Sequence, residues 1–512
     1  MDHTFEGYKR RDWVIAAVLA LCILFIAGMQ VTNGMPDFWA GDYAAYISVG
    51  KSIAEGTFEE QTVKNYIMHP STLPAEASEE GLVYVWGYPL LLSLIYRLVG
   101  LDLVNYSTII CYKLPSLIAY AITAGILYLF YRRFLSSGVS VFLTLIFSAS
   151  ADLLTQINYM YSDIVFLCAS VVTLWLAECF FDSFSKEENR RKIVFWAVSL
   201  GVSFWLTYEI RLNGNTLIYI TAAAHVIRMI QQKKKLRMDK MLPHILPYLT
   251  FCLLKIVSEA ILAPATPNTS DIGNLATESI FNNISYYFGL TRDYLNNLVG
   301  MKVWIPLAVF LVIGMVREGL KLRNIHLTGL LVGTYAVLLL LPYTQGLRYL
   351  ANILPLLLLY IAHGAGWIIN WIFRRIQGKG QSWKNFLAGI SIACLLLVYF
   401  PVINAGVANI RNDRQVKDTD VYSQEAIDLY RFIQNNTSED AIIAFYKPRI
   451  LSLNTGRLCI RPNKNGHVLE EADYYLYSSI VHNPTDLQLV EEAPLGLVYS
   501  SPNFELYMVR KN

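Results

Sequence analysis

The chain has 512 residues, of which 54% are hydrophobic and only 16% are charged. Soluble domains carry about 25% charged residues, so this composition excludes a string of ordinary soluble domains and indicates a membrane protein. The formal net charge of +3 is small and gives no reason to expect a nucleic-acid partner. Six of the seven cysteines lie inside apolar runs, without disulfide or zinc spacing, which predicts packing roles.

Apolar runs divide the first 402 residues into about eleven expected transmembrane spans. The first run follows Lys9-Arg10-Arg11 and lacks a small-residue cleavage site, so we expect it to remain as a signal anchor. A straight span needs about 20 residues, and several of the runs are shorter. The expected spans are 13–29, 107–130, 138–152, 163–182, 193–210, 212–230, 243–262, 303–317, 326–342, 349–371 and 385–402.

Positive charge alternates between successive loops. If the N-terminus is cytoplasmic, the inner segments hold most of the lysines and arginines and the outer loops hold few, as the positive-inside rule requires. The richest inner segment contains Lys233, Lys234, Lys235, Arg237 and Lys240. The pattern predicts a multi-pass protein with a cytoplasmic N-terminus and an external C-terminus. We expect its membrane to be the plasma membrane of a bacterium.

Two long outer loops interrupt the expected spans. The first loop, 30–106, contains the apolar stretch Gly87–Gly100, which is too short to span and would invert every later loop if it did. We expect it to lie in the membrane interface as a juxtamembrane helix. The second long outer loop covers 263–302.

The polarity of the chain changes after the last expected span. The tail contains turn signals and short strand-like stretches at Ala441–Tyr446 and Leu497–Tyr499. We therefore expect a mainly α, polytopic transmembrane domain over 1–402. A small extracytoplasmic α+β domain is expected over 403–512.

Two carboxylates stand where outer loops meet helices. Asp42 precedes a stretch with helical apolar spacing, and Asp163 lies at the outer start of the fourth expected span. Each residue has two interpretations: a helix cap, which stabilises by about 1 kcal/mol, or a group of a functional site. Asp37 is a weaker rival of Asp42, because Pro36-Asp37 suits an ordinary turn.

Several cations also lie at outer span ends. Arg211 could pair with Glu209 or bind a substrate, and Arg348 could snorkel to lipid headgroups or bind a substrate. Lys255 lies one helical turn from Glu259, which favours an intrahelical pair and leaves a substrate role open. An outer pocket with two carboxylates and several cations suits an anionic, lipid-anchored substrate.

Five short motifs occur in one order along the chain. They are Gly41-Asp42-Tyr43-Ala-Ala-Tyr46 with Ala54-Glu-Gly56, Trp86-Gly87-Tyr88-Pro89-Leu-Leu-Leu92, Tyr161-Ser-Asp163, Arg211-Leu-Asn213-Gly214, and Arg348-Tyr349 with Pro355. Together with the topology, they resemble the GT-C class of integral membrane glycosyltransferases, specifically the protein mannosyltransferase and aminoarabinose transferase branch. The resemblance covers residues 1–402, and the polar tail looks like the small C-terminal domain of parts of this class.

The resemblance implies transfer of a sugar from a polyprenyl-phosphate carrier to an acceptor on the non-cytoplasmic face, with inversion. Asp42 and Asp163 match the acids of the first and second outer loops. Asp42 would accept the proton of the acceptor, and Asp163 would orient that acceptor or a cation. Two departures concern the donor: Tyr43 stands where many relatives have glutamate, and Val85-Trp86 where some have lysine.

The remaining candidates belong to donor binding. Arg211 and Arg348 would bind the phosphate, with Tyr349, Lys255 and Asn213 as further substrate contacts. The second outer loop would cover the sugar, because its pairs Asn282-Asn283 and Tyr286-Tyr287 suit sugar hydroxyls and ring faces.

We expect no cofactor and no obligatory metal. A divalent ion could bind the carboxylate pair Asp418-Thr-Asp420, but nothing in its charged surroundings indicates one. The expected partners are the lipid-linked donor, membrane lipid, and a protein, lipid or glycan acceptor.

Other classes of protein share parts of this pattern. A membrane transporter would also have many spans and buried charges, although we see no two-fold hydropathy repeat. A polysaccharide polymerase or ligase would use lipid-linked glycans with a different loop, and a scaffold would need no acids. Asp42→Asn separates these readings, because only the proposed enzyme loses its base.

Overall fold

The computed structural model describes residues 7–32, 39, 41–67, 85–102, 106–185, 189–231, 242–262, 277–297, 303–321, 328–329, 331–334, 346–375, 380–412, 420–462, 471–481 and 495–510. Within these ranges, seven helices are long and apolar enough to cross a membrane. They are α1 (Arg10–Gln30), α5 (Tyr106–Arg132), α8 (Asp163–Ser185), α9 (Arg190–Ile210), α11 (Leu242–Ile261), α16 (Leu354–Arg375) and α17 (Gly380–Arg411). The expectation of a mainly α, polytopic membrane protein is confirmed.

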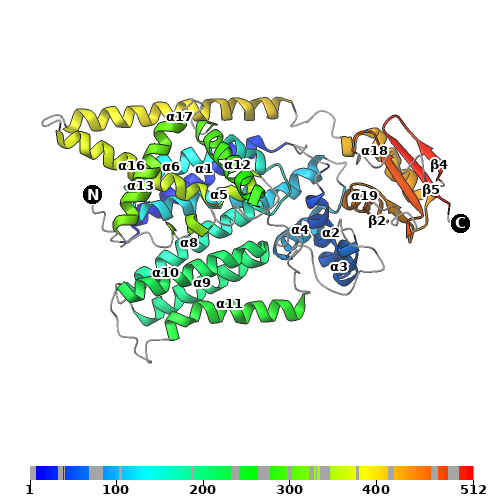
Figure 1. Ribbon diagram of the computed structural model, residues 1–512, viewed down its shortest axis with the longest axis horizontal. Helices are drawn as coiled ribbons and strands as arrows, with labels where there is room; N and C mark the ends of the chain where they lie inside the picture. The colour runs from blue at the N-terminus through cyan, green and yellow to red at the C-terminus, as the bar shows by residue number, and fades with distance from the viewer. Residues whose placement is uncertain are drawn as a thin grey trace.

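Consecutive long helices are neighbours in space. α1 packs on α5, α5 on α8, α8 on α9, and α9 on α11, while α17 returns to pack on α1. α13 (Trp304–Lys321) packs on α16. Figure 1 shows α9, α10 (Asn215–Gln231) and α11 as one group beside a second group that contains α1, α5, α13, α16 and α17.

Three of the expected spans do not correspond to a single described helix. The run 138–152 is not one helix but α6 (Ser137–Ser148) and α7 (Ala151–Gln156), because the Ser150 hydroxyl accepts a hydrogen bond from the amide of Leu153 and caps α7. The run 349–371 starts as α15 (Leu347–Leu350) and resumes as α16 after a turn, with proline in the first turn of α16. The run 326–342 lies mostly outside the described residues.

The first long loop forms three helices beside the bundle, α2 (Asp42–Glu55), α3 (Phe58–Ile67) and α4 (Gly87–Val99). α4 has 13 residues, too few to span, and leaves an apolar face exposed, with Leu98 80% accessible. An exposed apolar face suits a helix that lies in the membrane interface, as the sequence predicts. α2 packs closely on α4, because a Cβ at Gly50 would lie 2.9 Å from the carbonyl oxygen of Pro89.

The C-terminal domain is a small α+β unit, as expected. Its strands are β1 (Ile442–Ala444), β2 (Leu458–Ile460), β3 (Tyr474–Ser478), β4 (Leu495–Ser500) and β5 (Phe504–Val509). They form one sheet in the order β2-β1-β3-β5-β4, parallel among the first three strands and antiparallel among the last three. α18 (Gln424–Asn436) and α19 (Pro448–Thr455) complete the domain.

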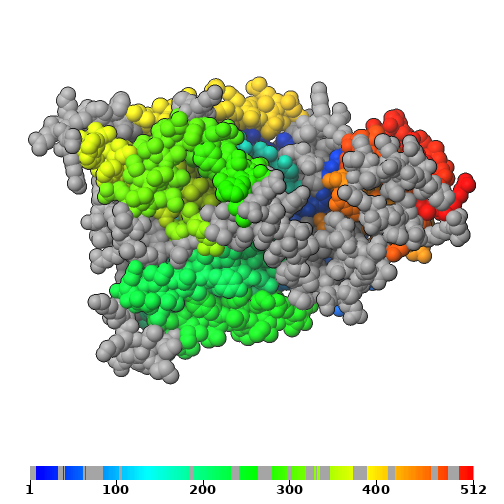
Figure 2. Space-filling view, in the orientation of Figure 1, coloured from blue at the N-terminus to red at the C-terminus, as the bar shows by residue number. Residues whose placement is uncertain are grey.

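Aromatic contacts join this domain to the first loop. Trp39 lies with its ring centroid 6.1 Å from that of Phe445 and 6.4 Å from that of Phe504. The hydroxyls of Tyr43 and Tyr422 are 3.5 Å apart. In Figures 1 and 2 the C-terminal sheet, in orange and red, lies at one end of the long axis, and the N-terminus marked in Figure 1 lies at the other.

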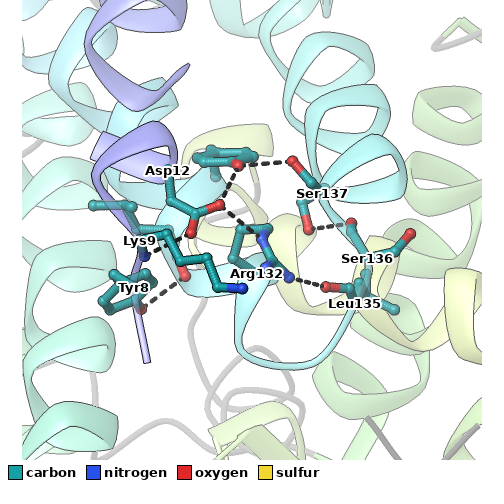
Figure 3. Close-up of polar contacts among 10 residues, drawn as sticks. Tyr8, Lys9, Asp12, Arg132, Leu135, Ser136 and Ser137 are labelled. Carbon is teal, nitrogen blue, oxygen red and sulfur yellow. Dashed lines mark hydrogen bonds and ion pairs between the residues drawn. The ribbon is translucent and has the colours of Figure 1, made fainter. Parts of the chain in front are cut away.

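A buried ionic network joins α1 to α5 near the N-terminus (Figure 3). Asp12 is fully buried and accepts hydrogen bonds from the side chain of Arg132 at 3.1 Å, the Lys9 amide at 2.9 Å and the Tyr128 hydroxyl at 3.0 Å. Arg132 also donates to the carbonyl oxygen of Leu135 at 2.8 Å. The network therefore fixes the start of α1 against the end of α5.

Candidate functional site

Asp42 is the first residue of α2 and faces two arginines. One carboxylate oxygen, Oδ2, accepts a hydrogen bond from Nη1 of Arg348 at 3.1 Å. The other oxygen, Oδ1, lies 3.4 Å from Nη1 of Arg449 in the C-terminal domain. Gly41 occupies the N-cap position, so Asp42 is not itself the cap. Its carboxylate is held between two parts of the chain that are distant in sequence.

Asp163 is the first residue of α8 and pairs with Arg211. The Arg211 guanidinium donates directly to Oδ1 of Asp163, which is buried. The preceding residue, Ser162, shares a hydrogen bond of 3.1 Å with the hydroxyl of Tyr46 on α2. This contact brings the helix that begins with Asp42 beside the helix that begins with Asp163.

Tyr349 links the two ion pairs into one cluster. Its ring centroid lies 5.0 Å from the guanidinium carbon of Arg348 and 5.9 Å from that of Arg211. Its hydroxyl accepts a hydrogen bond from Nη2 of Arg348 at 2.9 Å. The two distances from the ring centroid, 5.0 and 5.9 Å, are within the range of cation–π attraction. Asp42, Asp163, Arg211, Arg348 and Tyr349, all chosen from the sequence, are thus brought together.

The electrostatics of the cluster keep its arginines charged. Burial alone would lower the pKa of Arg348, but Tyr349, Asp163 and Asp42 outweigh it and raise that pKa. The pKa of Arg211 is also raised, because Asp163 and Tyr46 outweigh burial. Burial raises the pKa of Tyr46 to about 12, so its hydroxyl remains a neutral donor at physiological pH. The site therefore offers fixed cations for an anionic ligand.

Glycines at two chain turns place Arg211. α9 ends at Ile210, and Arg211 has extended backbone angles before the short helix η2 (Leu212–Gly214). A Cβ at Gly214 would lie 2.7 Å from the Thr207 backbone, and one at Gly87 would lie 2.4 Å from the carbonyl oxygen of Glu209. Only glycine permits these close approaches. The Trp-Gly-Tyr-Pro and Arg-Leu-Asn-Gly motifs therefore meet at the end of α9.

The other sequence candidates lie outside the ion-pair cluster. Lys255 pairs with Glu259 at 2.5 Å, the intrahelical pair that the spacing favours. Of the two interpretations of Arg211, the pairing with Glu209 is not observed, because Glu209 accepts from the Ser258 hydroxyl at 2.8 Å while Arg211 pairs with Asp163. Asn213 is exposed on η2. Asp37 lies outside the described residues.

Sequence reasoning missed Arg449. It lies in the first turn of α19, behind Pro448. A cation at the N-terminus of a helix opposes the helix dipole, so α19 itself gives no stabilising reason for an arginine at this position. The aliphatic part of Arg449 packs over Gly41, whose Cβ would lie 3.6 Å from Cβ of Arg449.

The second long loop also reaches the site. Its described part is α12 (Thr277–Asn297), on which Tyr287 is buried beside Gly346 and Tyr349. Burial raises the pKa of Tyr287 to about 12. Tyr287 therefore adds a neutral phenol next to the arginines.

The described part of the chain offers no group of three or more histidine, cysteine, aspartate or glutamate side chains that could hold a metal ion. Asp418 lies outside the described residues, and nothing is described of the Asp420 side chain. The expectation that no metal is required stays a prediction.

No family model and no curated protein matches the sequence. Solved structures do match the fold. ArnT from Cupriavidus metallidurans bound to undecaprenyl phosphate has a TM-score of 0.56 at 11% identity, over 98% of both chains. Archaeal oligosaccharyltransferase AglB from Archaeoglobus fulgidus, in complex with an inhibitory peptide and a dolichol-phosphate, has a TM-score of 0.61 at 11% identity, over 97% of this chain and 74% of that one. A complex of the Archaeoglobus fulgidus oligosaccharyltransferase with Zn and sulfate gives 0.60 at 10% identity, over 96% and 73%.

The chain therefore has the fold of the GT-C membrane glycosyltransferases, an aminoarabinose transferase and an oligosaccharyltransferase among them. The expectation from the short motifs is confirmed at the level of fold. The similarity extends through the C-terminal domain, since each match covers at least 96% of this chain.

Proposed function

We propose that the chain is a glycosyltransferase that moves a sugar from a polyprenyl-phosphate carrier to an acceptor on the non-cytoplasmic face of the membrane. The observation that carries this proposal is the cluster of two carboxylates and three arginines where α2, α8 and α15 meet α19. Similar folds have been solved with undecaprenyl phosphate or a dolichol-phosphate bound, which supports a lipid-phosphate donor here.

Asp42 is the proposed general base. The hydroxyl oxygen of the acceptor attacks the anomeric carbon, its proton passes to the Asp42 carboxylate, and the bond from that carbon to the phosphate oxygen breaks. The bonding electron pair leaves with the phosphate. Attack opposite the leaving group inverts the anomeric configuration. The leaving lipid phosphate needs cations rather than an acid.

Arg348 and Arg211 are the proposed phosphate ligands, since guanidinium groups donate two parallel hydrogen bonds to a phosphate. Tyr349 orients Arg348 through its hydroxyl. Asp163 holds Arg211 in place and could orient the acceptor. Asn213 and Lys255 remain secondary contacts of the donor in this proposal, and no metal takes part.

The test is sugar transfer from a panel of radiolabelled polyprenyl-phosphate sugars in proteoliposomes, with crude envelope extract as the source of acceptor. A protein, lipid or glycan that gains label in the extract identifies the acceptor. We expect Asp42→Asn to lower transfer about 10²–10⁴-fold, the usual contribution of a general base. Asp428→Asn, on the exposed side of α18, is the matched control and should transfer normally.

Equal transfer by wild type and Asp42→Asn would exclude Asp42 as the base. Flux of a labelled solute without label transfer would favour a transporter. Transfer that persists in the variant and extends a glycan chain would favour a polymerase or ligase whose base lies in another loop. A protein that binds only a partner, with neither activity, would be a scaffold.

A further inference from the structure

Arg449 belongs to the C-terminal domain, yet its guanidinium lies at the candidate base. Its side chain is 14% exposed, and its Nη1 is 3.4 Å from Oδ1 of Asp42. Arg348 approaches the other oxygen of the same carboxylate at 3.1 Å. Two guanidinium groups from separate domains therefore converge on one anionic group.

Packing between α2 and α19 holds this arrangement. The two helices contact each other directly. Gly41 leaves room for the side chain of Arg449. The hydroxyls of Tyr43 on α2 and Tyr422 are 3.5 Å apart and form a second contact of α2 with the C-terminal domain. Arg449 is thus fixed by the docking of the domain rather than by a flexible tail.

The charge of the cluster changes with Arg449. The four groups Asp42, Asp163, Arg211 and Arg348 carry two negative and two positive charges. Arg449 adds one further positive charge to this set. A phosphodiester-linked sugar donor carries one negative charge, which the added arginine compensates. After transfer, a protonated Asp42 leaves two positive charges in the set, and these match the dianionic phosphate of the released lipid.

We infer that Arg449 is a third ligand of the donor phosphate beside Arg348 and Arg211, so that the C-terminal domain supplies an arm of the phosphate site opposite Arg348. This inference rests on the proposed function. Before the donor binds, the Asp42 carboxylate takes the place between the two arginines. The arriving phosphate draws both guanidinium groups away from Asp42, which is then free to accept the proton of the acceptor.

The experiment measures binding of undecaprenyl phosphate, without transfer, to the full-length protein in nanodiscs, with undecaprenol as the uncharged control lipid. We compare wild type, Arg449→Gln and Arg431→Gln, the last being an exposed arginine of α18. The same arginine substitutions are repeated in the Asp42→Asn background.

We expect Arg449→Gln to weaken binding of undecaprenyl phosphate at least about tenfold, with no change for undecaprenol, because it removes a charge-assisted hydrogen bond. Asp42→Asn should bind more tightly than wild type, since the competing carboxylate is gone, and Arg449→Gln should still weaken binding in that background. Arg449→Lys keeps the positive charge but cannot donate two parallel hydrogen bonds to a phosphate. Its affinity for undecaprenyl phosphate should therefore lie between those of wild type and Arg449→Gln. Arg431→Gln should bind as wild type does.

Two outcomes overturn the inference. In the first, Arg449→Gln slows transfer in the chain that keeps Asp42, but leaves binding of undecaprenyl phosphate unchanged in the Asp42→Asn background. Arg449 then only positions the base. If folded wild type does not bind undecaprenyl phosphate, the proposed function itself fails. Thermal unfolding of each variant separates a lost contact from a lost fold.

Discussion

Asp42 and Asp163 occupy the same local position, the first residue of a helix, and each faces an arginine from a distant segment. A carboxylate at a helix N-terminus is favoured by the helix dipole, and the arginine adds a second favourable interaction. Asp42 follows the N-cap residue Gly41 and is not the cap itself, yet stabilising a helix start and serving a functional site are not exclusive roles for a carboxylate. The helix start determines where the carboxylate lies, and the arginine determines where it points.

Asp12 gives a residue-scale prediction about stability. Asp12→Asn removes the carboxylate charge that faces the buried guanidinium of Arg132 in the network of Figure 3. Breaking a buried ion pair costs about 3–5 kcal/mol, so the melting temperature of the detergent-solubilised protein should fall by several degrees. Asp428→Asn, whose partner is exposed, should melt like wild type. An unchanged melting temperature for Asp12→Asn would mean that the network does not contribute to stability.

The sequence predicts which residues share one side of the membrane, but not which residues pair. The expected spans and the charge alternation predict that Asp42 and Arg348 lie on the same side of the membrane, although 306 positions separate them in sequence. Glu209 does not pair with Arg211, the alternative that the sequence left open, because α9 ends between them and the extended backbone at Arg211 turns its side chain away from the helix. Arg449 was missed because no pattern in the spans refers to the C-terminal domain.

Among the helices, α13 and α16 pack closely because each has a glycine where they cross. A Cβ at Gly364 would lie 1.9 Å from the carbonyl oxygen of Phe310, and one at Gly314 would lie 1.9 Å from that of Tyr360. The two glycines let the helix backbones touch, the arrangement that small residues permit in membranes. Hydropathy indicates the two helices but not this crossing point.

Gly364→Ala tests that crossing. The added methyl group collides with the backbone of α13, so α13 and α16 must separate, and we expect a loss of about 1–3 kcal/mol in stability. Gly366→Ala lies on the same helix with no atom within 4 Å of the new methyl group, so it should be neutral or slightly stabilising. Thermal unfolding of the two variants in one detergent makes the comparison. Equal stability would show that the helices do not cross at these glycines.

Some element boundaries also escape the sequence. The broken run 138–152 reads as one apolar segment, and only the side chain of Ser150 reveals a second helix start. Length alone misleads here, because Ser150 is compatible with a helix interior as well as with a cap. The short helix α4 was predictable, since a helix of 13 residues cannot reach across a bilayer.

In the whole molecule, the antiparallel helices separate two ionic regions, the buried network around Asp12 and the cluster around Asp42 and Asp163. The hydrogen bonds of Asn158 to the end of α1 place Thr32 next to the segment that leads to Asp163, so Asp12 lies at the opposite end of α1. The candidate site and the C-terminal domain therefore lie at one end of the helix bundle, and the start of α1 with Asp12 lies at the other end. The sequence predicts this division from charge, whereas the docking of α19 on α2 depends on Gly41 and Arg449, which carry no periodic signal.

The orientation of this axis in the membrane follows from the distribution of positive charge and can be tested. The positive-inside rule predicts that the N-terminal end is cytoplasmic, and the proposed function requires the candidate site outside. α8 and α9 are joined at the site end by Asp163 and Arg211, so Arg190, at the start of α9, lies at the other end. In spheroplasts, a membrane-impermeant maleimide should label Arg431→Cys directly and Arg190→Cys only after permeabilisation, with the parent chain as the background for its native cysteines. The reverse pattern would place the acid–arginine cluster in the cytoplasm, where a donor presented on the outer face could not reach Asp42.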